Sequence, residues 1–191
     1  MVRILDIKEY AKKNNVPIMQ DEGIEFICKY IEENNVKKIL EIGSAIGYSA
    51  LKFASIADDI IVTTIERDEN RYKEAVSNIN NMNMNHQINI YHADALDIDI
   101  KDKYDLIFID AAKAQYTNFF NLYSPLLSDD GIIITDNMLF HGVKIEDAKS
   151  RSLRGLIRKL NNYTDFLLNN PLYDTTIFNL GDGMALTSKR H

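Results

Sequence analysis

The stretch I107-F-I-D-A-A-K-A-Q-Y116 ends an apolar run on Asp110 and places Lys113 one short turn beyond it. A second stretch, I132-I-I-T-D-N-M-L-F-H-G142, repeats the pattern with Asp136 and Asn137. Short apolar runs rich in β-branched residues are typical of strands buried in a parallel sheet. Two such strands that end in oxygen-bearing side chains predict an α/β fold with a binding site at one edge of its sheet.

Similar apolar runs alternate along the chain with helical patterns, which indicates parallel strands joined by crossover helices. A helix with one apolar face precedes a polar linker over 78–86, and a longer helix covers about 148–168. The last strands, T175-T-I-F-N-L180 and M184-A-L-T-S-K189, flank a G181-D-G183 turn and predict an antiparallel hairpin. The other predicted strands cover 37–43, 60–66, 88–94, 104–110 and 131–137. Together they predict one doubly wound domain with a mostly parallel seven-stranded sheet, divided into a helical segment (1–35) and a core (36–191).

The composition agrees with a single ordinary globular domain, since 191 residues suffice for one sizeable core. The sequence has no run of 18 apolar residues, and its first ten residues lack the apolar core of a signal peptide, so we expect a cytoplasmic protein. The single cysteine, Cys28, cannot form an internal disulfide, and its helical spacing predicts a core position. No cysteine and histidine spacing typical of zinc sites is present.

The net charge of −6 argues against non-specific binding of nucleic acids, but one segment differs from the average. Between His141 and Leu160 there are six basic residues against two acidic ones. Arg151, Arg154 and Arg158 recur at helical spacing and should share a face. Such a face is ordinarily solvated, but it could also bind the phosphates of RNA. His141 could meet RNA too, or be incidental.

The loop E41-I-G-S-A-I-G-Y-S49 follows the first predicted strand and has glycines four residues apart. It lacks both the dinucleotide fingerprint and the triphosphate motif. A carboxylate beside such a loop suits a cationic ligand, and S-adenosylmethionine (SAM) carries an ammonium and a sulfonium. Glu66 stands where an acid that binds ribose hydroxyls is expected, and Asp94 stands where it would bound the adenine. Each acid alone could be a surface or capping residue, but their joint placement indicates a cofactor site.

The motifs E-I-G-S-A-I-G-Y-S, T-I-E-R-D, F-I-D-A-A-K-A-Q-Y and T-D-N-M-L-F-H-G resemble those of metal-dependent class I O-methyltransferases related to catechol and caffeoyl-CoA O-methyltransferases. The chain looks most similar to small bacterial members that methylate 5-hydroxyuridine at the tRNA wobble position. The resemblance runs from about Val16 to Lys189 and implies a Rossmann-like fold and a homodimer. The chain departs from that pattern at Ala93, usually glycine, at His141, often arginine, and in a late-starting N-terminus.

The same resemblance implies the roles of individual residues. Asp110, Asp136 and Asn137 would ligate Mg²⁺ or Mn²⁺ through oxygen atoms, although each aspartate alone could simply cap the element that follows it. Lys113 would act as the general base, which requires a lowered pKa, or could be a solvated lysine. The implied cofactor-binding residues are Ile18, Glu41, Gly43, Ser49, Glu66, Asp94, Ala95 and Asp110.

The expected reaction is methylation of a hydroxyl whose conjugate base is stabilised by the cation, with SAM as the methyl donor. A chelating acceptor needs two neighbouring oxygens on a flat ring, which both a catechol and 5-hydroxyuridine provide. The basic helix favours 5-hydroxyuridine in the anticodon region of tRNA, with 5-methoxyuridine as the product. Two alternatives are an O-methyltransferase for a small catechol-like or caffeoyl-CoA-like phenol, and a SAM-binding module without catalysis.

Overall fold

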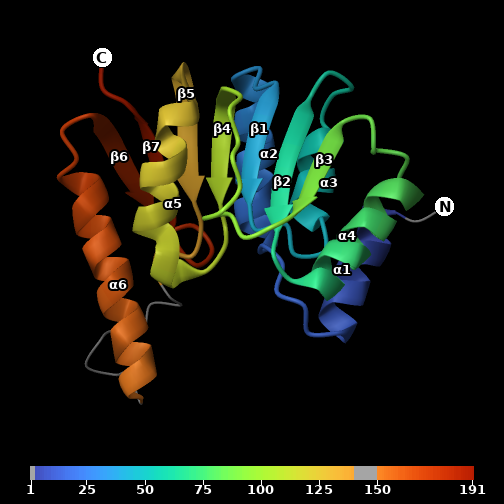
Figure 1. Cartoon of the computed structure of the whole chain (residues 1–191), viewed down its shortest axis with the longest axis horizontal. Coiled ribbons are helices and arrows are strands. Elements are labelled where there is room, and N and C mark those ends of the chain that lie inside the picture. Colours follow the sequence, from blue (N-terminus) through green and yellow to red (C-terminus); the bar gives the residue numbers. More distant parts are fainter. Residues whose placement is uncertain (1–2, 140–149) are drawn as a thin grey trace.

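The computed structural model describes residues 3–139 and 150–191, which form one α/β domain around a seven-stranded sheet (Figure 1). The strand order is β3-β2-β1-β4-β5-β7-β6. The first five strands are mutually parallel, and β7 pairs antiparallel with both β5 and β6. The strands are β1 (Lys38–Ile42), β2 (Ile61–Glu66), β3 (Ile88–His92), β4 (Tyr104–Ile109), β5 (Leu127–Thr135), β6 (Tyr173–Phe178) and β7 (Met184–Lys189).

Helices cover both faces of the sheet, and the alternation of side chains along each strand feeds a separate core on each face. Phe108 packs in the core that includes residues of the first four helices, whereas Ile107 and Ile109 pack against the last two. No helix in the described ranges is long and apolar enough to cross a lipid bilayer. The helices are α1 (Ile4–Lys13), α2 (Asp21–Glu33), α3 (Tyr48–Ala54), α4 (Glu69–Asn81), α5 (Tyr116–Tyr123) and α6 (Arg151–Leu168).

The predicted doubly wound domain, its seven strands and its terminal hairpin are confirmed. The prediction of a linker over 78–86 is wrong at its start, because α4 continues to Asn81. The side chain of Asn78 is buried there and donates to the carbonyl oxygen of Ile46 at 3.0 Å, so a polar residue occupies the inner face of the helix. Cys28 is only partly buried, but it packs against the core as expected.

The loops after β1 and β4 approach each other closely at the carboxyl edge of the sheet. The backbone N–H of Asp110 donates to the carbonyl of Ile42 at 3.0 Å. Gly43 has a φ of +99°, and a Cβ atom at this position would lie 2.2 Å from the carbonyl oxygen of Asp110. Only glycine satisfies both the left-handed backbone and the missing space.

We therefore expect Gly43→Ala to lower the free energy of unfolding by about 2–4 kcal/mol, because the added methyl must displace backbone. Gly155→Ala is the matched control, since a Cβ there meets nothing within 4 Å on helix α6. Alanine at that helical position should raise the free energy of unfolding by about 0.5–1 kcal/mol. Urea unfolding of both variants measures the difference, and a Gly43→Ala protein as stable as wild type would contradict the close contact.

Candidate active site

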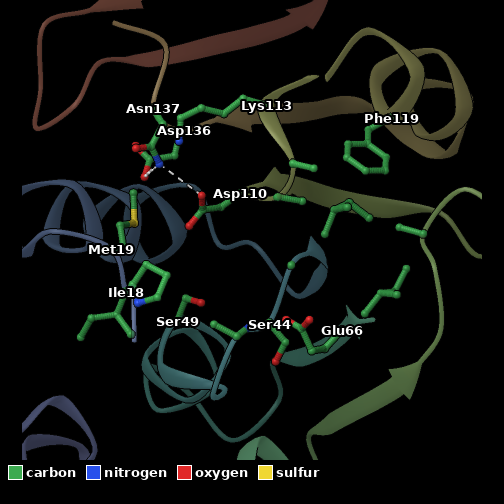
Figure 2. A pocket seen from close by; sticks show the side chains of 18 of the residues that line it. Ile18, Met19, Ser44, Ser49, Glu66, Asp110, Lys113, Phe119, Asp136 and Asn137 are labelled. Atoms are coloured by element: carbon green, nitrogen blue, oxygen red, sulfur yellow. Dashed lines mark hydrogen bonds between the residues drawn. The ribbon is translucent and has the colours of Figure 1, made fainter. Parts of the chain in front are cut away.

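A cavity of about 590 Å³ opens at the carboxyl edge of the sheet, where the loops after the parallel strands meet (Figure 2). This volume lies in the range of small-molecule sites, and the position is the one at which doubly wound sheets bind their ligands. Its walls come from the segment 17–23, the loop 42–49, the ends of β2 and β3, the segment 110–119, Asp136, Asn137 and the turn at 181–182.

One end of the cavity gathers the polar side chains that follow β4 and β5. These strands are parallel neighbours, so Asp110 and Asp136 leave the sheet side by side. The amide nitrogen of Asn137 donates to Asp110 Oδ1 at 3.2 Å and to Asp136 Oδ2 at 3.0 Å (Figure 2). Asn137 adopts a left-handed backbone with φ of 61°, which asparagine tolerates better than most residues. The Tyr116 hydroxyl donates to the carbonyl of Asp136 at 3.0 Å and fixes this turn.

Burial dominates the electrostatics of the two aspartates. Burial and, to a smaller extent, the charge of Asp110 raise the pKa of Asp136 to about 7. Burial also raises the pKa of Asp110, against the opposing effects of Lys113 and the Asn137 amide. Figure 2 shows the Lys113 side chain running toward Asp136 and Asn137. Among the described residues, Lys113 is thus the cation whose charge lowers the pKa of both aspartates.

These residues fit a hard divalent cation by the chemistry of their donors. The two carboxylates and one amide offer oxygen ligands and excess negative charge, as Mg²⁺ and Mn²⁺ prefer. No cluster of three or more His, Cys, Asp or Glu side chains suited to a metal occurs in the part of the chain that the structure describes. The amide of Asn137 would have to turn over to present its oxygen, because its nitrogen now faces both carboxylates.

The opposite end of the cavity is built around Glu66 at the end of β2. Its Oε2 accepts from the N–H of Ala45 and its Oε1 from the N–H of Asp68, both at 2.8 Å. Glu66 is only 6% exposed, so these bonds hold a rigid acceptor against the cavity wall. Asp94 is tied down by the N–H of Leu96, which donates to its Oδ1 at 2.9 Å. Two fixed carboxylates thus face the end of the cavity where a nucleoside with free hydroxyls would fit.

Glu41 takes a different place from the other acids. It is fully buried and accepts hydrogen bonds from the hydroxyls of Ser49 and Thr64. It lies behind the cavity wall and reaches the cavity only through Ser49, which does line it. Burial raises the pKa of Glu41 to about 7, although both hydroxyls act in the opposite direction.

The structure brings together nearly all the residues predicted for the site. Every predicted catalytic, cofactor-binding and metal-binding residue lines the cavity except Glu41. The predicted RNA-binding residues Arg151, Arg154 and Arg158 are exposed on α6 and do not line the cavity, and His141 lies outside the described residues. Sequence reasoning missed several lining residues: Met19, Ser44, Arg67, Arg71, Phe119, Gly181 and Asp182. Of these, Ser44 lies in the glycine-containing loop 41–49, so its place in the cavity wall could have been predicted from the sequence.

The raised pKa of Glu41 predicts a pH dependence of stability. The pKa is 4.5 in the unfolded chain and about 7 in the folded one, so the unfolded state releases its proton first as the pH rises. Glu41 therefore lowers the free energy of unfolding progressively between these pH values, by about 3 kcal/mol in total. Urea unfolding from about pH 4 to 8 should show a smaller decline for Glu41→Gln than for wild type. An unchanged slope would contradict a buried carboxylate, and the exposed Glu25→Gln is the control.

Comparisons with known proteins show that this chain is similar to O-methyltransferases. Residues 2–190 match a protein family described as O-methyltransferase. A flavonoid 3',5'-methyltransferase of Vitis vinifera is 31% identical, covering 93% of this chain and 80% of its own. A caffeoyl-CoA O-methyltransferase of Populus kitakamiensis is 26% identical, covering 94% and 80%.

Solved structures agree with these relatives in fold. A Staphylococcus aureus protein, described provisionally as a caffeoyl-CoA O-methyltransferase, is 44% identical with a TM-score of 0.95, covering 100% of this chain and 93% of its own. A methyltransferase of Podospora anserina, solved with S-adenosylhomocysteine (SAH) bound, has a TM-score of 0.88 at 20% identity. That alignment covers 100% of this chain and 89% of the Podospora chain, and at this identity it shows the shared fold.

Proposed function

This chain belongs to the O-methyltransferase family, and from that premise we propose that it transfers the methyl group of SAM to one of two neighbouring oxygens on a flat ring. A divalent cation held by Asp110, Asp136 and Asn137 would bind both oxygens of the acceptor. One observation carries the proposal: these three side chains meet at one end of a cavity whose other end presents Glu66. Donor and acceptor would therefore share one cavity.

Binding of the cofactor uses the rigid acids at the Glu66 end. The carboxylate of Glu66 accepts hydrogen bonds, so it suits the two hydroxyls of a ribose. Asp94, Ala95 and Phe119 line the neighbouring wall and would enclose the adenine between a carboxylate and apolar groups. The relatives solved with SAH or SAM support this choice of cofactor, including the proteins from Podospora anserina and Streptomyces achromogenes.

Chemistry at the other end needs an acceptor oxygen without its proton. A bound divalent cation would stabilise the conjugate base of the acceptor hydroxyl near neutral pH. Lys113 lies beside Asp110 and Asp136, and its Nζ would take up the released proton. Ile18 and Met19 line the cavity from the segment before α2 and would keep water from the reacting atoms. Holding the acceptor in line with the methyl group supplies much of the remaining rate.

A small phenol with vicinal oxygens is the acceptor that the relatives favour. The Populus protein is named for caffeoyl-CoA and the Vitis protein for flavonoids. Such a molecule offers two adjacent oxygens to the cation and a flat ring to the apolar wall. The cavity volume of about 590 Å³ is in the range of small-molecule sites, so part of a large acceptor would extend into solvent.

A second candidate acceptor is 5-hydroxyuridine at the tRNA wobble position. The observation that favours it is the basic face of α6, along which the exposed Arg151, Arg154 and Arg158 recur. Figure 1 shows the start of α6 extending beyond the carboxyl edge of the sheet, and the cavity opens at that edge. A flanking phosphate backbone would need such a positive face, whereas a small phenol would not.

The metal proposal predicts a loss of Mn²⁺ affinity in Asp136→Asn. Removing one of two carboxylate ligands should weaken Mn²⁺ binding at least about 100-fold, measured by calorimetry on chelator-treated protein. Asp130→Asn is the matched control, since it makes the same change at an exposed position on β5. Wild-type affinity in Asp136→Asn would show that these residues do not form the metal site.

The acceptor is tested by incubating the protein, SAM and Mg²⁺ either with a caffeoyl-type phenol or with tRNA that carries 5-hydroxyuridine, followed by mass spectrometry. We expect metal-dependent methylation of the phenol, and a double charge reversal of Arg151 and Arg154 to glutamate should leave its kcat/KM unchanged. Methylation of tRNA instead, reduced at least about tenfold by that reversal but not by reversal of Lys12 and Lys13, would favour the second candidate. Methylation of neither would contradict both.

A further inference from the structure

Ser44, in the loop between β1 and α3, carries a hydroxyl that the fold itself does not use. The residue is 1% exposed, and its Oγ has no hydrogen-bond partner among the described residues. It is the only buried side-chain nitrogen or oxygen in that part of the chain without a partner. Buried polar groups are nearly always paired, so an unpaired one that borders a cavity indicates a missing ligand atom.

Two backbone hydrogen bonds place Ser44 directly beside Glu66. The N–H of Ser44 donates to the carbonyl of Ile65 at 3.2 Å, and the next N–H, that of Ala45, donates to Glu66 Oε2 at 2.8 Å. Both residues line the cavity, and Figure 2 shows their side chains together at one wall. Ser44 and Glu66 would therefore meet the same part of any ligand.

The two side chains are complementary in hydrogen bonding. Glu66 as a carboxylate only accepts, and its two oxygens are already fixed by the N–H groups of Ala45 and Asp68. Ribose hydroxyls that donate to Glu66 still have oxygen lone pairs, which require a donor. The Ser44 hydroxyl is such a donor, and it stands next to the acceptor.

We propose that Ser44 Oγ donates a hydrogen bond to a ribose oxygen of the cofactor, so that Ser44 and Glu66 bind the ribose diol as a donor and acceptor pair. This inference rests on the proposed cofactor and adds a binding residue to its site. In this proposal the Ser44 hydroxyl is unpaired in the protein without cofactor and paired in the protein with cofactor bound. Removing it should therefore weaken binding without weakening the fold.

The test is calorimetric titration of Ser44→Ala and wild type with SAH and with its 2′-deoxy and 3′-deoxy analogues. We expect Ser44→Ala to bind SAH about tenfold more weakly, the effect of one hydrogen bond. The same substitution should make no difference with the analogue that lacks the bonded oxygen. Ser55→Ala is the matched control, because its hydroxyl donates to the Leu51 carbonyl at 2.6 Å and faces no cavity residue.

Thermal unfolding without ligand gives a second readout, and the melting temperature of Ser44→Ala should equal or exceed that of wild type. The proposal is overturned if Ser44→Ala binds SAH as tightly as wild type, or if it weakens SAH and both deoxy analogues equally. A lower melting temperature combined with equal weakening would indicate a structural role instead. The titration contains neither metal nor acceptor, so a failure here would leave the acceptor and metal proposals untouched.

Discussion

The site depends on the contact between the backbone at Gly43 and the backbone at Asp110. This contact joins the loop that borders the cofactor end of the cavity to the strand end that carries the first aspartate. Because β1 and β4 pair in parallel, their ends cannot slide relative to each other without breaking the register of the sheet. The spacing between the loop after β1 and Asp110 is therefore set by two paired strands. Methyl transfer is sensitive to such distances, since a displacement of about 1 Å can cost a large part of the rate.

A second constraint is the burial of acids at one edge of the sheet. Glu41, Glu66 and Asp136 are at most 6% exposed, and burial raises the pKa of both Glu41 and Asp136 to about 7. The protein without ligands thus holds carboxyl groups in surroundings that disfavour their charge. A cofactor with an ammonium and a sulfonium, together with a divalent cation, would offset this charge. The same feature that lowers the stability of the ligand-free protein would thereby raise its affinity for cationic ligands.

The sequence predicted the parts of the site that follow from periodicity and failed where they depend on non-local packing. Asp110, Asp136 and Glu66 could be placed because each ends or directly follows a strand, and parallel strands bring their ends together. The position of Glu41 behind the cavity wall could not be predicted. Its carboxylate is held there by the hydroxyls of Ser49 on α3 and Thr64 on β2, which come from other elements. The polar run after Asn78 was misread because composition does not reveal that a buried carbonyl, that of Ile46, receives the amide. Phe119 lines the cavity without any motif that marks it.

The turn of the terminal hairpin shows why the cavity wall near Asp136 and Asn137 could not be predicted from local sequence patterns. The Gln20 amide donates to Asp182 at 3.0 Å, a contact between residues 162 positions apart. The same turn accepts the N–H of Met138 at Gly183 and that of Leu139 at Asp182, both at 2.9 Å. One turn thus contacts both the segment before α2 and the segment after Asp136 and Asn137. Gly181 and Asp182 of this turn line the cavity themselves, and the charge of Asp182 contributes to the raised pKa of Asp136, so a change in the turn would alter the cavity beside Asp136 and Asn137.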